Sequence, residues 1–260
     1  MIKLKPIVLS EGRSKKITID EAIQIIKKNN PSGISKNYIY RGIGNTNFSA
    51  GFVQPSKYNR KSAYTINTYT TLFDNLPSWQ KYPKRSKSIV CTTRLHYSSN
   101  FGNSYVIFPK EGSKIGICPD ADIWTSFFDL HDNGVTMDDF NYEMKKLFNA
   151  AGNHSDEISY PKMLKMFDFI SRHKAEYNRE IGNEILDIWD SNEEFSKLHF
   201  FNFLNKFLLN PKYNNFRLTL YNSKFNYDTE IPHELWTDGD CVIIESDHMH
   251  VFLKKLRAYK

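Results

Sequence analysis

The sequence predicts an α+β protein whose mainly antiparallel sheet is interrupted by a helical insertion. Short runs of β-branched and aromatic residues fill the first 119 positions. Between residues 120 and 210 the apolar residues recur at helical spacing, and from residue 211 the pattern typical of strands returns. We therefore expect residues 1–119 and 211–260 to be two halves of one domain, with residues 120–210 inserted between them.

The composition is typical of a soluble globular protein. Of the 260 residues, 40% are hydrophobic and 25% charged, and the formal net charge is +6. The three cysteines lie far apart without a CxxC pair, which argues against a disulfide framework or a zinc knuckle and favours a reducing compartment. No signal peptide or membrane-spanning stretch is evident, so we expect a cytoplasmic protein without a membrane partner, acting in a host cytoplasm if it is viral.

The first third of the chain predicts two strands and two helices. Residues 2–9 are expected to form a strand, and a clear amphipathic helix is expected to begin at Thr18 or Asp20. Residues 37–42 then read as a strand, residues 44–62 as an irregular polar loop and residues 65–73 as a short helix.

The strand at residues 37–42 ends on Arg41 and Gly42. A guanidinium can clamp an anion, and glycine lets a backbone approach closely. The competing interpretation is an arginine in an ordinary surface ion pair.

The stretch from Lys87 to Gly116 is the region around which the chain is organised. A short apolar strand ends on Cys91, Thr92 and Thr93, a short helix follows as far as Phe101, and residues 105–108 and 114–118 read as further strands. Hydroxyls at a helix start can hold a phosphate or a ribose, because helix N-termini present unpaired N–H groups. The alternative is that a threonine simply caps the helix.

The rest of the chain predicts a run of helices and then strands. Helices are expected at residues 122–130, 136–151, 160–177, 181–189 and 192–209. Residues 216–221 read as a strand, and Glu234 begins another that leads through Asp238-Gly239, a hairpin signal, into residues 241–245. Residues 249–256 are expected to form a last edge strand.

Three of these features occur in an order that resembles a known enzyme family. Tyr40-Arg41-Gly42, then Cys91-Thr92-Thr93, then Glu234-Leu235-Trp236 before Gly239 are similar to the arginine, serine-threonine-serine and glutamate motifs of the mono-ADP-ribosyltransferases, especially the bacterial-toxin and bacteriophage members. The resemblance covers about residues 36–118 and 216–253. The helical segment between them has no counterpart in it.

The resemblance implies an ADP-ribosyltransferase-like split sheet and transfer of ADP-ribose from the substrate NAD to a macromolecular acceptor, either a host protein or a nucleic acid. Glu234 would be the catalytic residue, because a carboxylate stabilises the positive charge that develops on the ribose. The NAD-binding residues would be Arg41, Gly42, Cys91, Thr92, Thr93, Tyr97 and Phe101.

Three departures from the family pattern leave a different function open. Cys91 stands where the family usually has a serine, Pro232 stands where arginine-modifying members have a second acid, and the helical insertion is extra. The alternative is a catalytically inactive protein of the same fold, serving as a binding or virion structural protein.

Two further interpretations belong to other classes. A basic nucleic-acid-binding protein would use its best cationic patch, which consists of Lys81, Lys84, Arg85 and Lys87 around Tyr82. His248 and His250 would share one face of the predicted last strand, but no third ligand is evident. We therefore predict no metal site.

Overall fold

The structure is a computed structural model that describes residues 14–44, 46–60, 67–127, 134–135, 137–155, 158–180 and 183–259. The chain divides into two compact units. The sheet unit comprises Met1–Arg60, Tyr82–Ala121 and Leu218–Lys260, and the helical unit comprises Lys61–Lys81 and Asp122–Arg217. The strand predicted at residues 2–9 lies outside the described residues.

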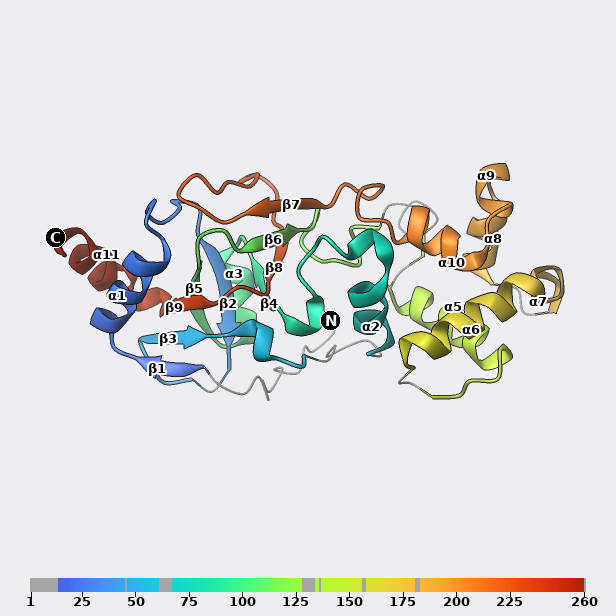
Figure 1. The fold of residues 1–260 in the computed structure, drawn as a ribbon, viewed down its shortest axis with the longest axis horizontal. Helices are drawn as coiled ribbons and strands as arrows, with labels where there is room; N and C mark the ends of the chain where they lie inside the picture. Colours follow the sequence, from blue (N-terminus) through green and yellow to red (C-terminus); the bar gives the residue numbers. More distant parts are fainter. Residues whose placement is uncertain are drawn as a thin grey trace. The chain divides into compact units, whose positions relative to one another are not determined.

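The sheet unit is built on one sheet of nine strands in the order β1-β3-β9-β5-β2-β4-β8-β6-β7 (Figure 1). Every strand pair with a recorded register is antiparallel. The protein is therefore α+β with an antiparallel sheet. The strands are β1 Lys15–Ile17, β2 Ile39–Ile43, β3 Ala50–Val53, β4 Ile89–Thr92, β5 Asn103–Pro109, β6 Lys114–Ile117, β7 Arg217–Leu220, β8 Glu234–Thr237 and β9 Cys241–Glu245.

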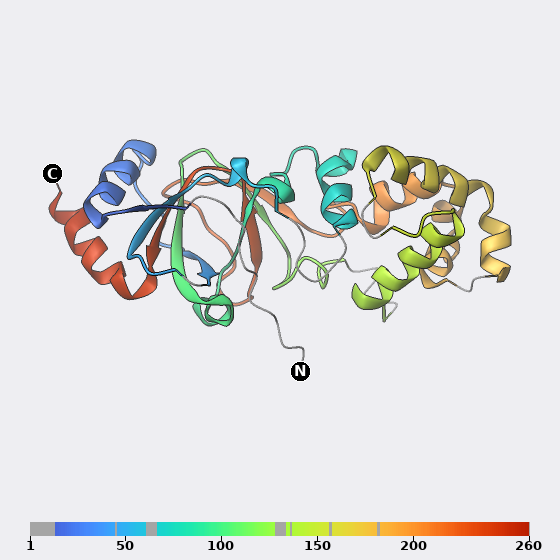
Figure 2. The ribbon, with the colours of Figure 1, turned by 90° about the horizontal axis from the view of Figure 1, so that it is seen from below.

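The two faces of this sheet carry separate apolar clusters, because side chains alternate along each strand. On the face that we call the α1 face, helices α1 (Ile19–Asn29) and α11 (Met249–Ala258) lie side by side against Val106, Phe108 and Ile244 (Figures 1 and 2). On the opposite face, which we call the Tyr221 face, Ile107 and Ile243 pack with other strand residues and with Tyr221, Phe225 and Tyr227.

Helix α1 begins where its sequence signals predict. Thr18 is the N-cap: its side chain accepts a hydrogen bond from the Glu21 N–H, and Glu21 accepts one from the Thr18 N–H, forming a capping box. Ala22, Ile23 and Ile26 are buried on one side of the helix. Their spacing places them together on the sheet.

Three sequence predictions for the sheet unit are wrong. Residues 249–256 form helix α11 and not an edge strand, because Met249, Phe252, Leu253 and Leu256 lie at helical spacing and pack on the α1 face. The supposed loop at residues 44–62 contains β3, which pairs with both β1 and β9.

The third error is the hairpin predicted at Asp238-Gly239. The strands on either side of it, β8 and β9, are not neighbours in the sheet. Gly239 lacks the positive φ that a two-residue hairpin of the expected type requires, and a Cβ there would come within 2.1 Å of the Ser113 hydroxyl. The chain passes from one part of the sheet to another at this point.

The helical unit contains more and shorter helices than predicted. They are α2 Thr68–Asn75, α5 Met137–Ala150, α6 Tyr160–Arg172, α7 Lys174–Glu180, α8 Glu184–Asp190, α9 Glu193–Ser196, α10 Phe200–Phe203 and a π-helical turn at Leu204–Leu208. The helix predicted at 160–177 is broken at His173, and the one predicted at 192–209 is three pieces. Within the described part of residues 122–130 the chain forms turns, where Asp122 accepts hydrogen bonds from the Trp124 N–H and the Ser126 hydroxyl.

The core of the helical unit is largely aromatic. Trp79 packs against Phe73 and Phe216 with ring centroids 5.0 Å apart in each case, and its indole N–H donates to the Leu209 carbonyl. The contacts of Lys61–Lys81 place this segment with the helical unit, whereas the sequence analysis assigned it to the N-terminal half of the sheet domain. None of the helices in the described ranges is both long and apolar enough to cross a membrane.

Candidate functional site

The three motifs lie on three neighbouring strands, β2, β4 and β8. Thr92 of β4 is paired with Tyr40 of β2 on one side and with Glu234 of β8 on the other. Side chains that are paired in this way point to the same face of an antiparallel sheet. Tyr40, Thr92 and Glu234 therefore form a row across the α1 face.

Arg41 is outside this row, because it is one residue further along β2 than Tyr40. It shares the Tyr221 face with Ile39 and Ile43 on its own strand, and with Cys91 and Leu235 of β4 and β8. Its side chain is buried, with the guanidinium carbon 5.9 Å from the centre of the Phe101 ring. The structure thus brings Thr92 to Glu234 but turns Arg41 away from both.

Glu234 has a different arginine as its partner. Its Oε1 lies 2.9 Å from Nη1 of Arg85, and the side chains of Arg85 and Glu234 are only 8% and 15% exposed. The Sγ of Cys118 is 3.9 Å from the same oxygen. Backbone hydrogen bonds from the Glu234 N–H to the Asp120 carbonyl and from the Cys118 N–H to the Glu234 carbonyl fix the start of β8 beside β6.

Arg85 is held in place by aromatic side chains. It lies in a short 3-10 turn, Arg85–Lys87, just before β4, and its guanidinium is 5.2 Å from the centre of the Trp236 ring. The Trp236 indole N–H donates to the Pro83 carbonyl, and Tyr82 stacks on the same indole at 5.9 Å. Burial, with a smaller effect of Cys118, raises the pKa of Tyr82 to about 12, so this phenol is neutral near pH 7 and is not a general base.

The two threonines have different local roles. The Thr92 hydroxyl accepts a hydrogen bond from the Arg94 N–H and so orders the entry to helix α3, Leu95–Ser98. The Thr93 hydroxyl accepts from the His233 N–H, and the Thr93 N–H donates to the His233 carbonyl. Thr93 therefore joins the end of β4 to the start of β8, which supports the position of Glu234.

Gly42 is in close contact with protein backbone. A Cβ at this position would come within 1.9 Å of the Ser98 carbonyl oxygen and 2.8 Å of the Phe101 Cβ. Helix α3 and the turn after it therefore pack directly on β2. Glycine is required here for that contact.

Two other predicted binding residues, Cys91 and Tyr97, have different surroundings. Cys91 is buried in the apolar cluster of the Tyr221 face. Tyr97 is 38% exposed on α3, with its ring 4.3 Å from that of His96.

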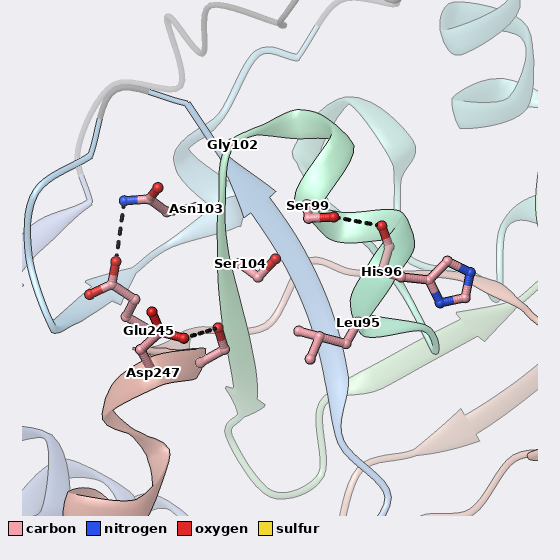
Figure 3. A pocket seen from close by; sticks show the side chains of 9 residues that line it. Leu95, His96, Ser99, Gly102, Asn103, Ser104, Glu245 and Asp247 are labelled. Carbon is pink, nitrogen blue, oxygen red and sulfur yellow. Dashed lines mark hydrogen bonds between the residues drawn. The ribbon is translucent and has the colours of Figure 1, made fainter.

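A pocket of about 570 Å³ lies beside α3 and the start of β5 (Figure 3). Its lining combines hydroxyl, amide, imidazole and carboxylate groups from α3, the start of β5 and the residues after β9. Glu245, at the end of β9, accepts a hydrogen bond from Asn103 at 3.2 Å and pairs with His248 at 3.0 Å. The residues lining the pocket are Leu95, His96, Ser99, Gly102, Asn103, Ser104, Glu245, Ser246 and Asp247, and neither Thr92 nor Glu234 is among them.

The geometry bears on the two interpretations of other classes. His248 ends a 3-10 turn and His250 lies in α11, so they do not share a strand face, and the described residues contain no group of three potential metal ligands. In the basic patch, Arg85 pairs with Glu234 and the Lys87 ammonium donates to the Tyr58 carbonyl. The cationic surface on which a nucleic-acid site was predicted is therefore smaller than the sequence indicated.

Arg85 is the residue that the sequence analysis missed at this site. It appeared only as one member of a cationic run. No known protein family, curated protein or solved structure matches this chain.

Proposed function

We propose that this protein is a mono-ADP-ribosyltransferase that transfers ADP-ribose from NAD to a macromolecular acceptor. The observation that carries the proposal is the direct pairing of Thr92 with Glu234 on neighbouring strands, beside the strand that bears Arg41-Gly42. The motifs occur far apart in the sequence, yet the strands that carry them are neighbours in the sheet.

The proposed chemistry depends on the fixed charge of Glu234. The bond between nicotinamide and ribose breaks with its electron pair leaving on nicotinamide, so positive charge develops on the ribose. A carboxylate held beside the ribose stabilises that charge. A nucleophilic atom of the acceptor then forms the new bond to the ribose and loses its proton.

The fixed position of Glu234 supports this role. It is the first residue of β8, anchored by backbone hydrogen bonds on the side of β6 and by the Thr93–His233 link on the side of β4. Its side chain is 15% exposed. Preorganisation of this kind is how a site stabilises a developing charge without reorganising.

The experiment is to incubate the purified chain with NAD labelled in the adenine moiety together with a cell lysate, and to measure nicotinamide release and label transfer to protein, DNA and RNA. We expect release and transfer by the wild type, and loss of both in Glu234→Gln while NAD still binds. Glu193→Gln makes the same chemical change on an exposed helix and is the matched control. Wild-type turnover by Glu234→Gln would remove the assignment.

A binding or structural protein of the same fold is the second candidate. The observation that favours it is that Arg85 neutralises Glu234 and that Arg41 is turned to the other face. Such a protein would bind NAD or ADP without releasing nicotinamide. The same experiment therefore distinguishes the two candidates.

A further inference from the structure

Arg85 and Glu234 form an ion pair that is mostly withdrawn from water. Removing two charges from water costs several kcal/mol, and their attraction often repays no more than this cost. The pair is therefore not explained by stability alone. The pair also lies beside the neighbouring strands β4 and β8, which carry two of the candidate motifs, and this points to a role at that site.

The geometry of Arg85 suits an anion. Its guanidinium lies against the Trp236 ring, which is itself fixed by the hydrogen bond to Pro83, so the plane of the guanidinium is restricted. A guanidinium of fixed orientation binds a diphosphate through two parallel hydrogen bonds. The Glu234 Oε1 lies 2.9 Å from Nη1 of Arg85, so this guanidinium already has an anion beside it.

Two other arginines of the sheet unit are less suitable. Arg41 is on the opposite face of the sheet from Glu234. Arg94 is near in sequence, but its guanidinium donates to the Glu230 carbonyl, outside the row of paired residues. Of these three arginines, Arg85 is the one that a ligand at Glu234 would meet.

We propose that Arg85 is the diphosphate-binding residue of this site, and that it exchanges its partner when a nucleoside diphosphate group binds. In the free protein the guanidinium is paired with Glu234; in the complex it binds the phosphates, and the Glu234 carboxylate becomes available. This inference rests on the proposed function for the role of Glu234. Phosphate and Glu234 then compete for the guanidinium of Arg85, so removing the Glu234 carboxylate should strengthen the binding of a diphosphate.

The experiment measures ADP binding to the full chain by calorimetry, for the wild type and for four variants. Arg85→Gln should weaken binding by about tenfold or more, which is about 1.4 kcal/mol. Arg94→Gln and Arg257→Gln, the controls on arginines of the same unit outside the motifs, should stay within about twofold of the wild type. Glu234→Gln should bind ADP several times more tightly, because it removes the competing carboxylate.

A purely structural pair gives the opposite pattern. The inference is wrong if Arg85→Gln binds ADP as tightly as the wild type does. It is also wrong if Glu234→Gln binds ADP more weakly than the wild type, or if the wild type does not bind ADP at millimolar concentration. Should Arg85→Gln fail to fold, the double variant Arg85→Gln/Glu234→Gln removes both charges and should fold but bind ADP as weakly as expected for the loss of Arg85. Tight binding by the double variant would equally contradict the inference.

Failure of this inference and failure of the proposed function have different signatures. ADP binding that depends on Arg85 without nicotinamide release keeps the binding site and rejects the transferase. Nicotinamide release that depends on Glu234 but not on Arg85 keeps the transferase and rejects the role of Arg85.

Discussion

Arg41 and Glu234 point to opposite faces of the same sheet. Their strands are separated only by β4, and the residue of β2 that is aligned with Thr92 and Glu234 is Tyr40. Because side chains alternate on a strand, a difference of one residue in register decides which group reaches the site. The arginine that contacts Glu234 comes instead from the turn before β4.

The first prediction is that Arg41 contributes more to stability than to ligand binding. Arg41→Gln changes a side chain that is buried among the residues of the Tyr221 face, and we expect it to lower the free energy of unfolding by about 2 kcal/mol. Urea denaturation followed by circular dichroism measures this effect. Arg94→Gln, which changes a half-buried arginine of the same unit whose guanidinium donates to the Glu230 carbonyl, should cost less than Arg41→Gln.

The resemblance to the transferases implies the reverse for Arg41, namely loss of NAD binding with little effect on folding. A stable Arg41→Gln protein that no longer binds NAD would show that the side chain reaches the ligand despite its register. The two measurements on one variant therefore decide the role of this arginine.

The second prediction concerns the contact between β2 and α3. Gly42→Ala places a methyl group 1.9 Å from the Ser98 carbonyl oxygen, so α3 must move away from β2. We expect the free energy of unfolding to fall by about 3 kcal/mol, which urea denaturation measures. Gly44→Ala is the control, since its Cβ would lie 3.7 Å from the nearest neighbouring atom and should be tolerated.

The sequence predicted the elements better than their arrangement. The capping signals at Thr18 and Glu21 located α1, and alternating or β-branched runs located the strands around Arg41, Cys91 and Glu234, because these signals are local. Strand β3 was missed since Ala50–Val53 is short and includes a glycine. Local patterns of this kind do not specify which distant strands pair with one another.

The candidate site shows the same limit more clearly. The three motifs were expected to meet, and their strands are neighbours. The face on which each side chain lies depends on register, which is set by packing across the whole sheet. The sequence also gave no means to pair Arg85 with Glu234, since they are nearly 150 positions apart.

The third prediction is a pH dependence at the start of α1. The Thr18 backbone N–H, and then its hydroxyl, donate to Glu21 and hold the pKa of this carboxyl below its ordinary value of 4.5. A pKa that is lowered in the folded state means that the stabilisation is complete above the unfolded value and is lost as the pH falls through the folded value. Glu21→Gln should therefore unfold at a lower temperature than the wild type near pH 7.

Below the folded pKa of Glu21 the two proteins should unfold at similar temperatures. Thermal melts across the acid range measure this convergence. Glu230→Gln changes an exposed carboxylate of the same unit and serves as the control. A difference between Glu21→Gln and the wild type that is constant at all pH values would contradict the capping interpretation.

The fourth prediction is a coupling between Arg85 and Glu234 in stability. Arg85→Met leaves the Glu234 carboxylate mostly buried without this partner, which costs roughly 3–5 kcal/mol when the second charge stays behind. The double variant Arg85→Met/Glu234→Leu removes both charges and should recover most of that loss, because apolar side chains of similar volume replace the pair. The exposed pair Lys197–Glu193 should show a coupling below about 1 kcal/mol in the same cycle. If the double variant is as stable as the wild type but no longer binds ADP, the ion pair is retained for binding. If the losses of stability in the single variants simply add, the two side chains are not coupled, and the partner exchange proposed for Arg85 loses its basis.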